Sequence, residues 1–228
     1  MSAGLRRPLI CLVSDRRRVV PAGADSLVHL VRHAARAGVD LVHLRESGLD
    51  DRALLSLARA AVDAVRGTSA RVLINDRVDV AIAAGADGVH LRADSVSAER
   101  VRDVAPPHFL IGRSVHTRGE AVAAAHSGID YLLAGTVYPT PSKPQGAVLL
   151  GLGGLADLVR AVDVPVLAIG GVVADKVGDI AATGAAGIAA IGLFADVPTD
   201  ADQEPFEQAL QEIVARLRAP FQQEPQRG

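Results

Sequence analysis

Hydrophobic residues gather in short continuous runs, and longer stretches with a different spacing separate these runs. Short apolar runs are typical of parallel strands that are buried on both faces of a sheet. Between them, stretches such as 26–37 and 51–65 repeat Leu, Val and Ala at the spacing of an amphipathic helix. The runs predict eight strands, at 9–14, 41–46, 72–76, 88–92, 109–115, 131–137, 165–170 and 187–193.

A short phrase containing a glycine recurs where a predicted helix ends and a strand begins. It is found at 37–40, 84–87, 127–130 and 183–186. Glycine suits the left-handed residue that often closes a helix. Eight alternations of strand and helix in 228 residues predict an α/β fold, a single (β/α)8 TIM barrel rather than an open doubly wound sheet.

The predicted domain spans residues 1–220, and a polar stretch at 221–228 is expected to be a disordered tail. Hydrophobic residues make up 49% of the chain, which is enough for a large core. The net charge of −2 shows no excess of basic residues of the kind that nucleic-acid-binding proteins carry. No apolar run approaches the ~20 residues of a membrane span, and the first residues do not resemble a signal peptide.

The single cysteine, Cys11, excludes a disulfide within the chain and fits a reducing compartment. We therefore expect a cytoplasmic protein with a small-molecule ligand, without nucleic-acid or membrane partners. A homo-oligomer is left open.

Polar residues follow nearly every predicted strand, and in barrels of this type the functional groups lie at the carboxyl ends of the strands. Gly170 and Gly171 follow the seventh strand, and Gly192 and Leu193 lie at the end of the eighth. Glycines at these two places let backbone N–H groups approach an anion, which predicts a phosphate-binding site. The alternative is that they only allow tight turns.

Two cations on the rim suit an anionic ligand. Arg45 follows the second strand, and Lys143 lies with Thr140 and Ser142 in the loop after the sixth. A guanidinium binds carboxylate or phosphate in a fork, and an ammonium acts as a point charge. The alternatives are ordinary surface charge or an ion pair between Arg45 and Glu46.

Three histidines lie at or near strand ends. His43 and His90 sit inside apolar runs, so we interpret them as hydrogen-bonded residues of the core or wall rather than as zinc ligands. His116 ends its strand close to Arg113 and Ser114, and an imidazole can take and give a proton near neutral pH.

Oxygen ligands suited to magnesium also lie on the rim. Asn75, Asp76 and Asp94 are the candidates, because Mg²⁺ prefers oxygen donors. For Asp76, the alternatives are an ion pair with Arg77 or a helix cap.

Taken together, the rim segments resemble the thiamine phosphate synthase and TenI-like superfamily. The resemblance runs in unbroken order from about residue 9 to 195 and rests on the segments 42–46, 73–79, 85–91, 112–116, 138–143, 168–172 and 184–188. It implies a barrel enzyme of thiamine biosynthesis that acts on a small thiazole phosphate.

The resemblance includes a synthase branch, which joins a pyrimidine diphosphate to a thiazole phosphate with Mg²⁺. Its usual Gln-x-Arg-x-Lys motif matches His43, Arg45 and Ser47 here, so the Gln and the Lys are missing. Its metal-binding Asp in the loop after the fourth strand matches Ser95. If the protein is a synthase, the metal ligands would be Asp76 and Asp94.

The resemblance also includes a tautomerase branch, which aromatises a thiazole carboxylate phosphate by moving one proton and needs no cofactor. The segments 43–46 and 112–116 resemble its motifs, with His116 as the acid and base. Since the synthase groups are missing, the sequence favours the tautomerase. The alternatives are the Mg²⁺-dependent synthase and a regulator that binds a phosphate ligand without turnover. The predicted substrate-binding residues are His43, Arg45, Asn75, Arg113, Ser114, Thr140, Ser142 and Lys143.

Overall fold

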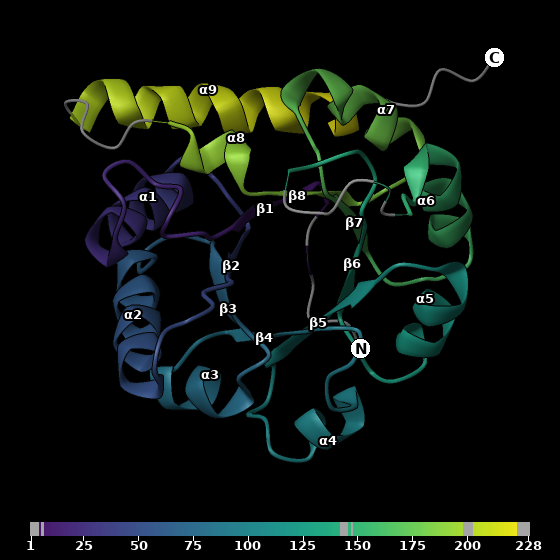
Figure 1. Cartoon of the computed structure of the whole chain (residues 1–228), viewed down its shortest axis with the longest axis horizontal. Helices are drawn as coiled ribbons and strands as arrows, with labels where there is room; N and C mark the ends of the chain where they lie inside the picture. The colour runs from purple at the N-terminus through teal and green to yellow at the C-terminus, as the bar shows by residue number, and fades with distance from the viewer. Residues whose placement is uncertain (1–4, 6, 142–145, 147, 198–202, 223–228) are drawn as a thin grey trace.

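Eight parallel strands form a closed barrel in which β1 pairs with both β2 and β8. The computed structural model describes residues 5, 7–141, 146, 148–197 and 203–222. The predicted (β/α)8 barrel is therefore confirmed, with the strands in chain order around the ring (Figure 1). The strands are β1 (Leu9–Val13), β2 (Leu41–Leu44), β3 (Arg71–Asn75), β4 (Gly88–Leu91), β5 (Leu110–Val115), β6 (Tyr131–Gly135), β7 (Val166–Ile169) and β8 (Gly187–Ala190).

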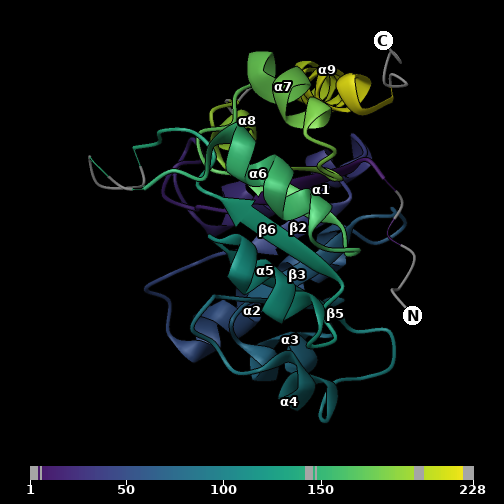
Figure 2. The ribbon, with the colours of Figure 1, turned by 90° about the vertical axis from the view of Figure 1, so that its right-hand side faces the viewer.

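Helices surround the barrel, and the long C-terminal helix α9 packs on α1 and α7. Helices α7 and α9 lie at the opposite edge of the molecule from α4 in both views (Figures 1 and 2). The helices are α1 (Ala24–Arg36), α2 (Asp51–Ala64), α3 (Val78–Ala84), α4 (Ala98–Arg102), α5 (Arg118–Ala125), α6 (Gly151–Arg160), the short 3-10 helix η1 (Ala174–Lys176), α7 (Val177–Ala182), α8 (Gly192–Ala195) and α9 (Gln203–Gln222). In the described part of the chain, no helix has the length and apolar character needed to span a bilayer.

Two predicted boundaries are wrong. Helix α9 continues to Gln222, past the expected start of the tail at 221, and the half-buried Phe221 packs on the core. The rest of the predicted tail, 223–228, lies outside the described residues. Strand β8 ends at Ala190 rather than 193, and Gly192 and Leu193 belong to α8. An apolar run does not by itself separate a strand from a buried helix, and here Phe194 continues the run into the core.

The alternation of side chains along the strands builds two apolar layers. Residues such as Ile10, Val42 and Ile74 face the helices. Their neighbours fill the inside of the barrel, in a cluster made of Leu9, Cys11, Val13, Leu41, Leu73, Leu110, Tyr131, Leu133, Leu167 and Ala189. The same alternation puts His43, Asn75 and Ser114 on the inner side, towards the carboxyl ends of the strands.

The recurring glycine phrase has a structural role at the other end of the barrel. Gly38, Gly85, Gly128 and Gly184 all have positive φ, as predicted for helix ends. The aspartates of the phrase accept hydrogen bonds from the strand before them. Asp40 accepts from the Ile10 N–H at 2.8 Å, Asp87 from Val72 at 2.8 Å and Asp130 from Ile111 at 2.7 Å. These carboxylates therefore join β1 to β2, β3 to β4 and β5 to β6.

Candidate functional site

A cavity of about 680 Å³ opens at the carboxyl ends of the strands. It brings together seven of the predicted site residues: His43, Arg45, Asn75, Asp76, Asp94, Ser114 and His116. It is also lined by Leu44, Glu46, Ser47, Leu49, Leu54, Arg77, Arg92, Ala93, Leu133 and Ile169. Arg113, Thr140 and the glycine loops do not line it, and Ser142 and Lys143 lie outside the described residues.

A buried neutral histidine forms one wall of the cavity. His43 is 2% exposed, and its Nε2 lies 3.1 Å from Asn75 Oδ1, an acceptor, so this nitrogen carries the ring proton. Burial lowers the pKa of His43 to about 4, because the charged form loses its hydration. His43 Nδ1 is buried without a hydrogen-bond partner among the described residues. The ring is therefore uncharged, and its acceptor nitrogen Nδ1 accepts no hydrogen bond from a described residue.

A second buried histidine supports the first from the core. The His90 and His43 rings lie 4.4 Å apart, and burial lowers the pKa of His90 well below its usual value. His90 Nδ1 is 3.0 Å from the Tyr131 hydroxyl, and Nε2 is 2.8 Å from Ser114 Oγ. Gly112 leaves room for Tyr131, since a Cβ there would lie 2.1 Å from its ring. As the apolar runs predict, both are hydrogen-bonded residues of the barrel interior, with His43 at the wall of the cavity and His90 in the core.

The exposed His116 lies at the end of β5, and two hydrogen bonds orient it. Its backbone N–H donates to Glu120 Oε2 at 2.6 Å, and its ring Nδ1 lies 2.5 Å from the Gly135 carbonyl oxygen. Because a carbonyl only accepts, Nδ1 carries the proton, and in the neutral ring Nε2 is an acceptor. This is the tautomer that a general base requires.

Arg45 is an exposed cation with no ion-pair partner among the described residues. The alternative of an Arg45–Glu46 pair is wrong, because Glu46 is engaged elsewhere. Its carboxylate accepts from Ser14 Oγ at 2.6 Å and forms an ion pair with Arg16 at 3.1 Å. Ser14 Oγ in turn accepts from the Arg45 backbone N–H at 3.0 Å, which holds the start of this loop.

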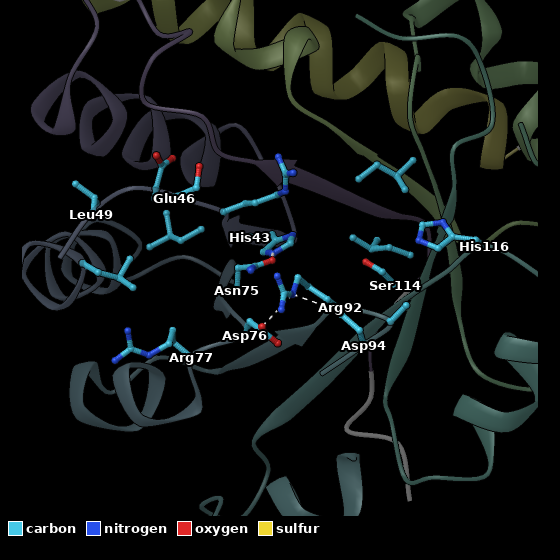
Figure 3. A pocket seen from close by; sticks show the side chains of 17 residues that line it. His43, Glu46, Leu49, Asn75, Asp76, Arg77, Arg92, Asp94, Ser114 and His116 are labelled. Carbon is cyan, nitrogen blue, oxygen red and sulfur yellow. Dashed lines mark hydrogen bonds and ion pairs between the residues drawn. The ribbon is translucent and has the colours of Figure 1, made fainter. Parts of the chain in front are cut away.

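Asp76 lies directly after β3 in a left-handed conformation, with φ of 62°. Its Oδ2 is 3.0 Å from Arg92 Nε, and its Oδ1 accepts a hydrogen bond from Ser95 Oγ. Arg92 also approaches Asp94 at 3.4 Å. Figure 3 shows Arg92 between the two carboxylates, with dashed lines to them, while Ser114 and His116 lie farther along the cavity. The alternative of an ion pair between Asp76 and Arg77 is wrong, because Arg77 pairs with Asp51 and Asp79.

The magnesium site implied by the resemblance does not fit these residues. Both oxygens of Asp76 are engaged, one of them by a cation, and Asp94 is 77% exposed. Ser95 supplies a neutral hydroxyl where the synthase branch has a carboxylate. Among the described residues, no group of three or more His, Cys, Asp or Glu side chains could hold a metal ion.

Arg113 supports a loop rather than the cavity. Its guanidinium donates to the carbonyl oxygens of Ala93 at 2.8 Å, Ser95 at 3.3 Å and Val96 at 3.1 Å. It therefore ties the loop after β4 to β5. The contact of Arg113 with substrate stays a prediction, and the engagement of its guanidinium by three carbonyl oxygens does not favour it.

The glycines after β7 have a packing role. A Cβ on Gly170 would lie 2.5 Å from Thr136 Cγ2, and one on Gly171 would lie 2.4 Å from the Pro139 carbonyl oxygen. Both positions also have positive φ. At Gly192, the nearest atoms to a Cβ are side-chain ends of Arg18 and Asp196, at 3.1 Å. Phosphate binding at these loops and Leu193 stays a prediction.

Comparison with known proteins identifies the family. A family model described as thiamine monophosphate synthase, TMP-TENI, matches residues 10–194. The chain belongs to this family. It is 36% identical over 210 residues to a thiamine-phosphate synthase of Roseiflexus castenholzii, covering 92% of this chain and 90% of that one. It is 40% identical to a thiamine-phosphate synthase of Methanoculleus marisnigri, covering 83% of this chain and 89% of the relative.

A solved structure from the family has the same architecture. Thiamine phosphate pyrophosphorylase from Pyrococcus furiosus superposes with a TM-score of 0.75 at 32% identity, covering 92% of this chain and 96% of that one. The Roseiflexus and Methanoculleus relatives both carry the name of the synthase. They support the superfamily and favour the synthase alternative over the tautomerase that the motifs favoured.

Three residues near the site were not singled out from the sequence. Tyr131 supports His90, and Arg77 lines the cavity with its guanidinium engaged by Asp51 and Asp79. Arg92 is the third. The sequence signal that could have identified Arg92 is its position directly after β4, beside the end of β3.

Proposed function

We propose that the protein is an enzyme of thiamine biosynthesis that joins a pyrimidine diphosphate to a thiazole phosphate. One observation carries the proposal: the chain is similar over about nine-tenths of its length to proteins named for this reaction. The bond from the pyrimidine carbon to the diphosphate breaks, and the thiazole takes the place of the leaving group. Diphosphate departure develops negative charge that fixed cations must stabilise.

The residues of the cavity support specific roles in that reaction. Arg45 lines the cavity without an ion-pair partner among the described residues, and a guanidinium binds phosphate oxygens in a fork. Asn75 offers a neutral hydrogen-bonding group at the wall, suited to a heterocycle, and the uncharged His43 ring orients its side chain. His116 presents an acceptor nitrogen. Because a magnesium ion does not fit Asp76 and Asp94, no step is assigned to one.

A second candidate is the proton shift of the tautomerase branch, with a thiazole carboxylate phosphate as substrate. The observation that favours it is the state of Asp76, which Arg92 and Ser95 engage. A proton shift releases no diphosphate, so it needs only anchors for the substrate's anionic groups and one base near neutral pH. His116 would remove a proton from one carbon and return one to another.

One experiment separates the candidates. The purified protein is incubated with each substrate set, with and without EDTA, and products are followed by mass. Condensation to thiamine phosphate supports the proposal. Aromatisation of the thiazole without condensation would replace it with the tautomerase. If a ligand binds and neither product forms, the protein is a regulator.

His116→Asn tests the role of the base. If the protein is a tautomerase, the variant should lose about 10²–10⁴-fold in rate, the usual contribution of one acid–base group, and should keep its affinity for inorganic phosphate. His126→Asn is the matched control, because His126 lies at the end of α5, does not line the cavity and bonds the Val122 carbonyl of its own helix. A His116→Asn variant that still exchanges solvent deuterium into product at nearly full rate would show that another group is the base.

A further inference from the structure

Arg92 is built into a turn that aims it at the cavity. The residue follows β4 directly, its backbone N–H donates to Ser95 Oγ at 3.0 Å, and its carbonyl accepts from the Ser95 N–H at 3.2 Å. Ser95 Oγ then donates to Asp76. One serine therefore closes the turn and connects it to the end of β3.

Two further contacts hold the ends of this arrangement. The Asp76 backbone N–H donates to the His90 carbonyl at 2.9 Å, which places Asp76 beside the end of β4. From the other side, the Arg113 guanidinium binds three carbonyl oxygens of the loop after β4. The cation and its carboxylate partner are therefore positioned by the barrel and not only by each other.

The guanidinium of Arg92 is only partly used by these contacts. Its Nε is the nitrogen that approaches both Asp76 and Asp94, and the side chain is 59% exposed. The two terminal nitrogens donate no hydrogen bond to a described residue, and Arg92 lines the cavity. Terminal guanidinium N–H groups bind phosphate oxygens in pairs, and a guanidinium stays charged at any physiological pH.

We propose that Arg92 is a built-in cation that stands where a divalent metal would bind Asp76, and that it binds the phosphate or diphosphate group of the ligand without metal. The inference rests on the proposed function only for the choice of a phosphate or diphosphate group as the ligand. It follows that Asp76 neutralises and orients Arg92 rather than coordinating a metal ion. Arg92 is then a residue that touches substrate.

Binding of inorganic pyrophosphate, measured by calorimetry, tests the first half of the proposal. Wild-type protein should bind the probe equally well in EDTA and in excess Mg²⁺. Arg92→Gln should weaken binding about tenfold or more, the effect of losing a hydrogen-bonded charge. Arg77→Gln is the matched control, since it removes an arginine from the same cavity whose three guanidinium nitrogens are occupied by Asp51 and Asp79. Its affinity should change less than threefold.

Binding of Mn²⁺, followed by electron paramagnetic resonance, tests the second half. Wild-type protein should not bind the ion at millimolar concentration. A variant with both Arg92→Gly and Ser95→Asp removes the cation and adds a carboxylate beside Asp76, and it should gain binding. Thermal melting shows whether each variant is folded.

Three results would overturn the proposal: pyrophosphate binding that needs Mg²⁺, an Arg92→Gln variant with wild-type affinity, or Mn²⁺ binding by wild-type protein that Asp76→Asn abolishes. None of these measurements uses turnover. An enzyme that fails to condense the two substrates but binds pyrophosphate through Arg92 in EDTA would refute the proposed function and leave this inference standing.

Discussion

The buried contact between Tyr131 and His90 predicts a sizeable loss of stability in Tyr131→Phe. The hydroxyl lies 3.0 Å from His90 Nδ1, and both side chains are buried, at 0% and 1% exposure. Phenylalanine keeps the ring that packs against Gly112 and removes only the hydroxyl. His90 Nδ1 is then left without its partner in the interior of the barrel.

The magnitude follows from the cost of an unpaired buried polar group, about 1–3 kcal/mol. For a chain of this size, each kcal/mol lowers the melting temperature by roughly 2–4 °C. We therefore expect Tyr131→Phe to melt about 2–12 °C below the wild type. In urea, the midpoint should fall with an unchanged slope, because the surface exposed on unfolding stays the same.

Tyr138→Phe is the matched control for this loss. The Tyr138 hydroxyl is buried without a hydrogen-bond partner among the described residues. Its ring also lies 4.2 Å from the Lys176 ammonium, a contact that phenylalanine keeps. Tyr138→Phe should therefore be as stable as the wild type or slightly more stable. If Tyr131→Phe matches this control, the hydrogen bond to His90 contributes nothing and the reasoning is wrong.

Two further predictions concern pH and backbone space. His43 has a pKa of about 4 when folded against 6.5 ordinarily, so the unfolded chain binds the extra proton. Stability should therefore fall as pH drops from 6.5 to 4, and His43 should contribute up to about 3 kcal/mol of that loss. His43→Gln should reduce the slope in urea titrations without removing it, because burial also lowers the pKa of His90; an unchanged slope would assign it to other groups. Gly170→Ala should lower the melting temperature, because its Cβ would meet Thr136 and its φ is 95°. Gly192→Ala should fold normally, which makes it the cleaner test of phosphate binding at these loops; equal destabilisation of the two variants would contradict the packing role of Gly170.

The barrel and its wall residues could be predicted because their signals are local. Each strand is a continuous apolar run, and a histidine inside such a run, as at His43, points into the barrel or onto the helices. The ends of β8 and α9 could not be placed from the same signal, since buried helix and strand look alike in short apolar segments. Phe194 and Phe221 show this, because both are apolar and both belong to helices.

The ion pairs of the rim could not be predicted from neighbours in the sequence. Arg77 is adjacent to Asp76, yet Asp76 pairs with Arg92. The parallel register explains this, because Asn75 pairs with His90 on the neighbouring strand and the residues just beyond the two strand ends lie side by side on the rim. Partners on a rim are thus set by strand register, which becomes available only when the closed sheet is known. The residues 142 and 143 were assigned from the loop motif alone and lie outside the described structure.

The aspartates that join β1 to β2, β3 to β4 and β5 to β6 connect these strands in pairs through carboxylate hydrogen bonds. At the corresponding position before β8 stands Ala186, which has no carboxylate to offer. The β7–β8 pair therefore lacks the carboxylate hydrogen bond that joins each of the other three pairs. Amides of β7 and β8 should therefore exchange with solvent faster than those of the three pairs that an aspartate joins.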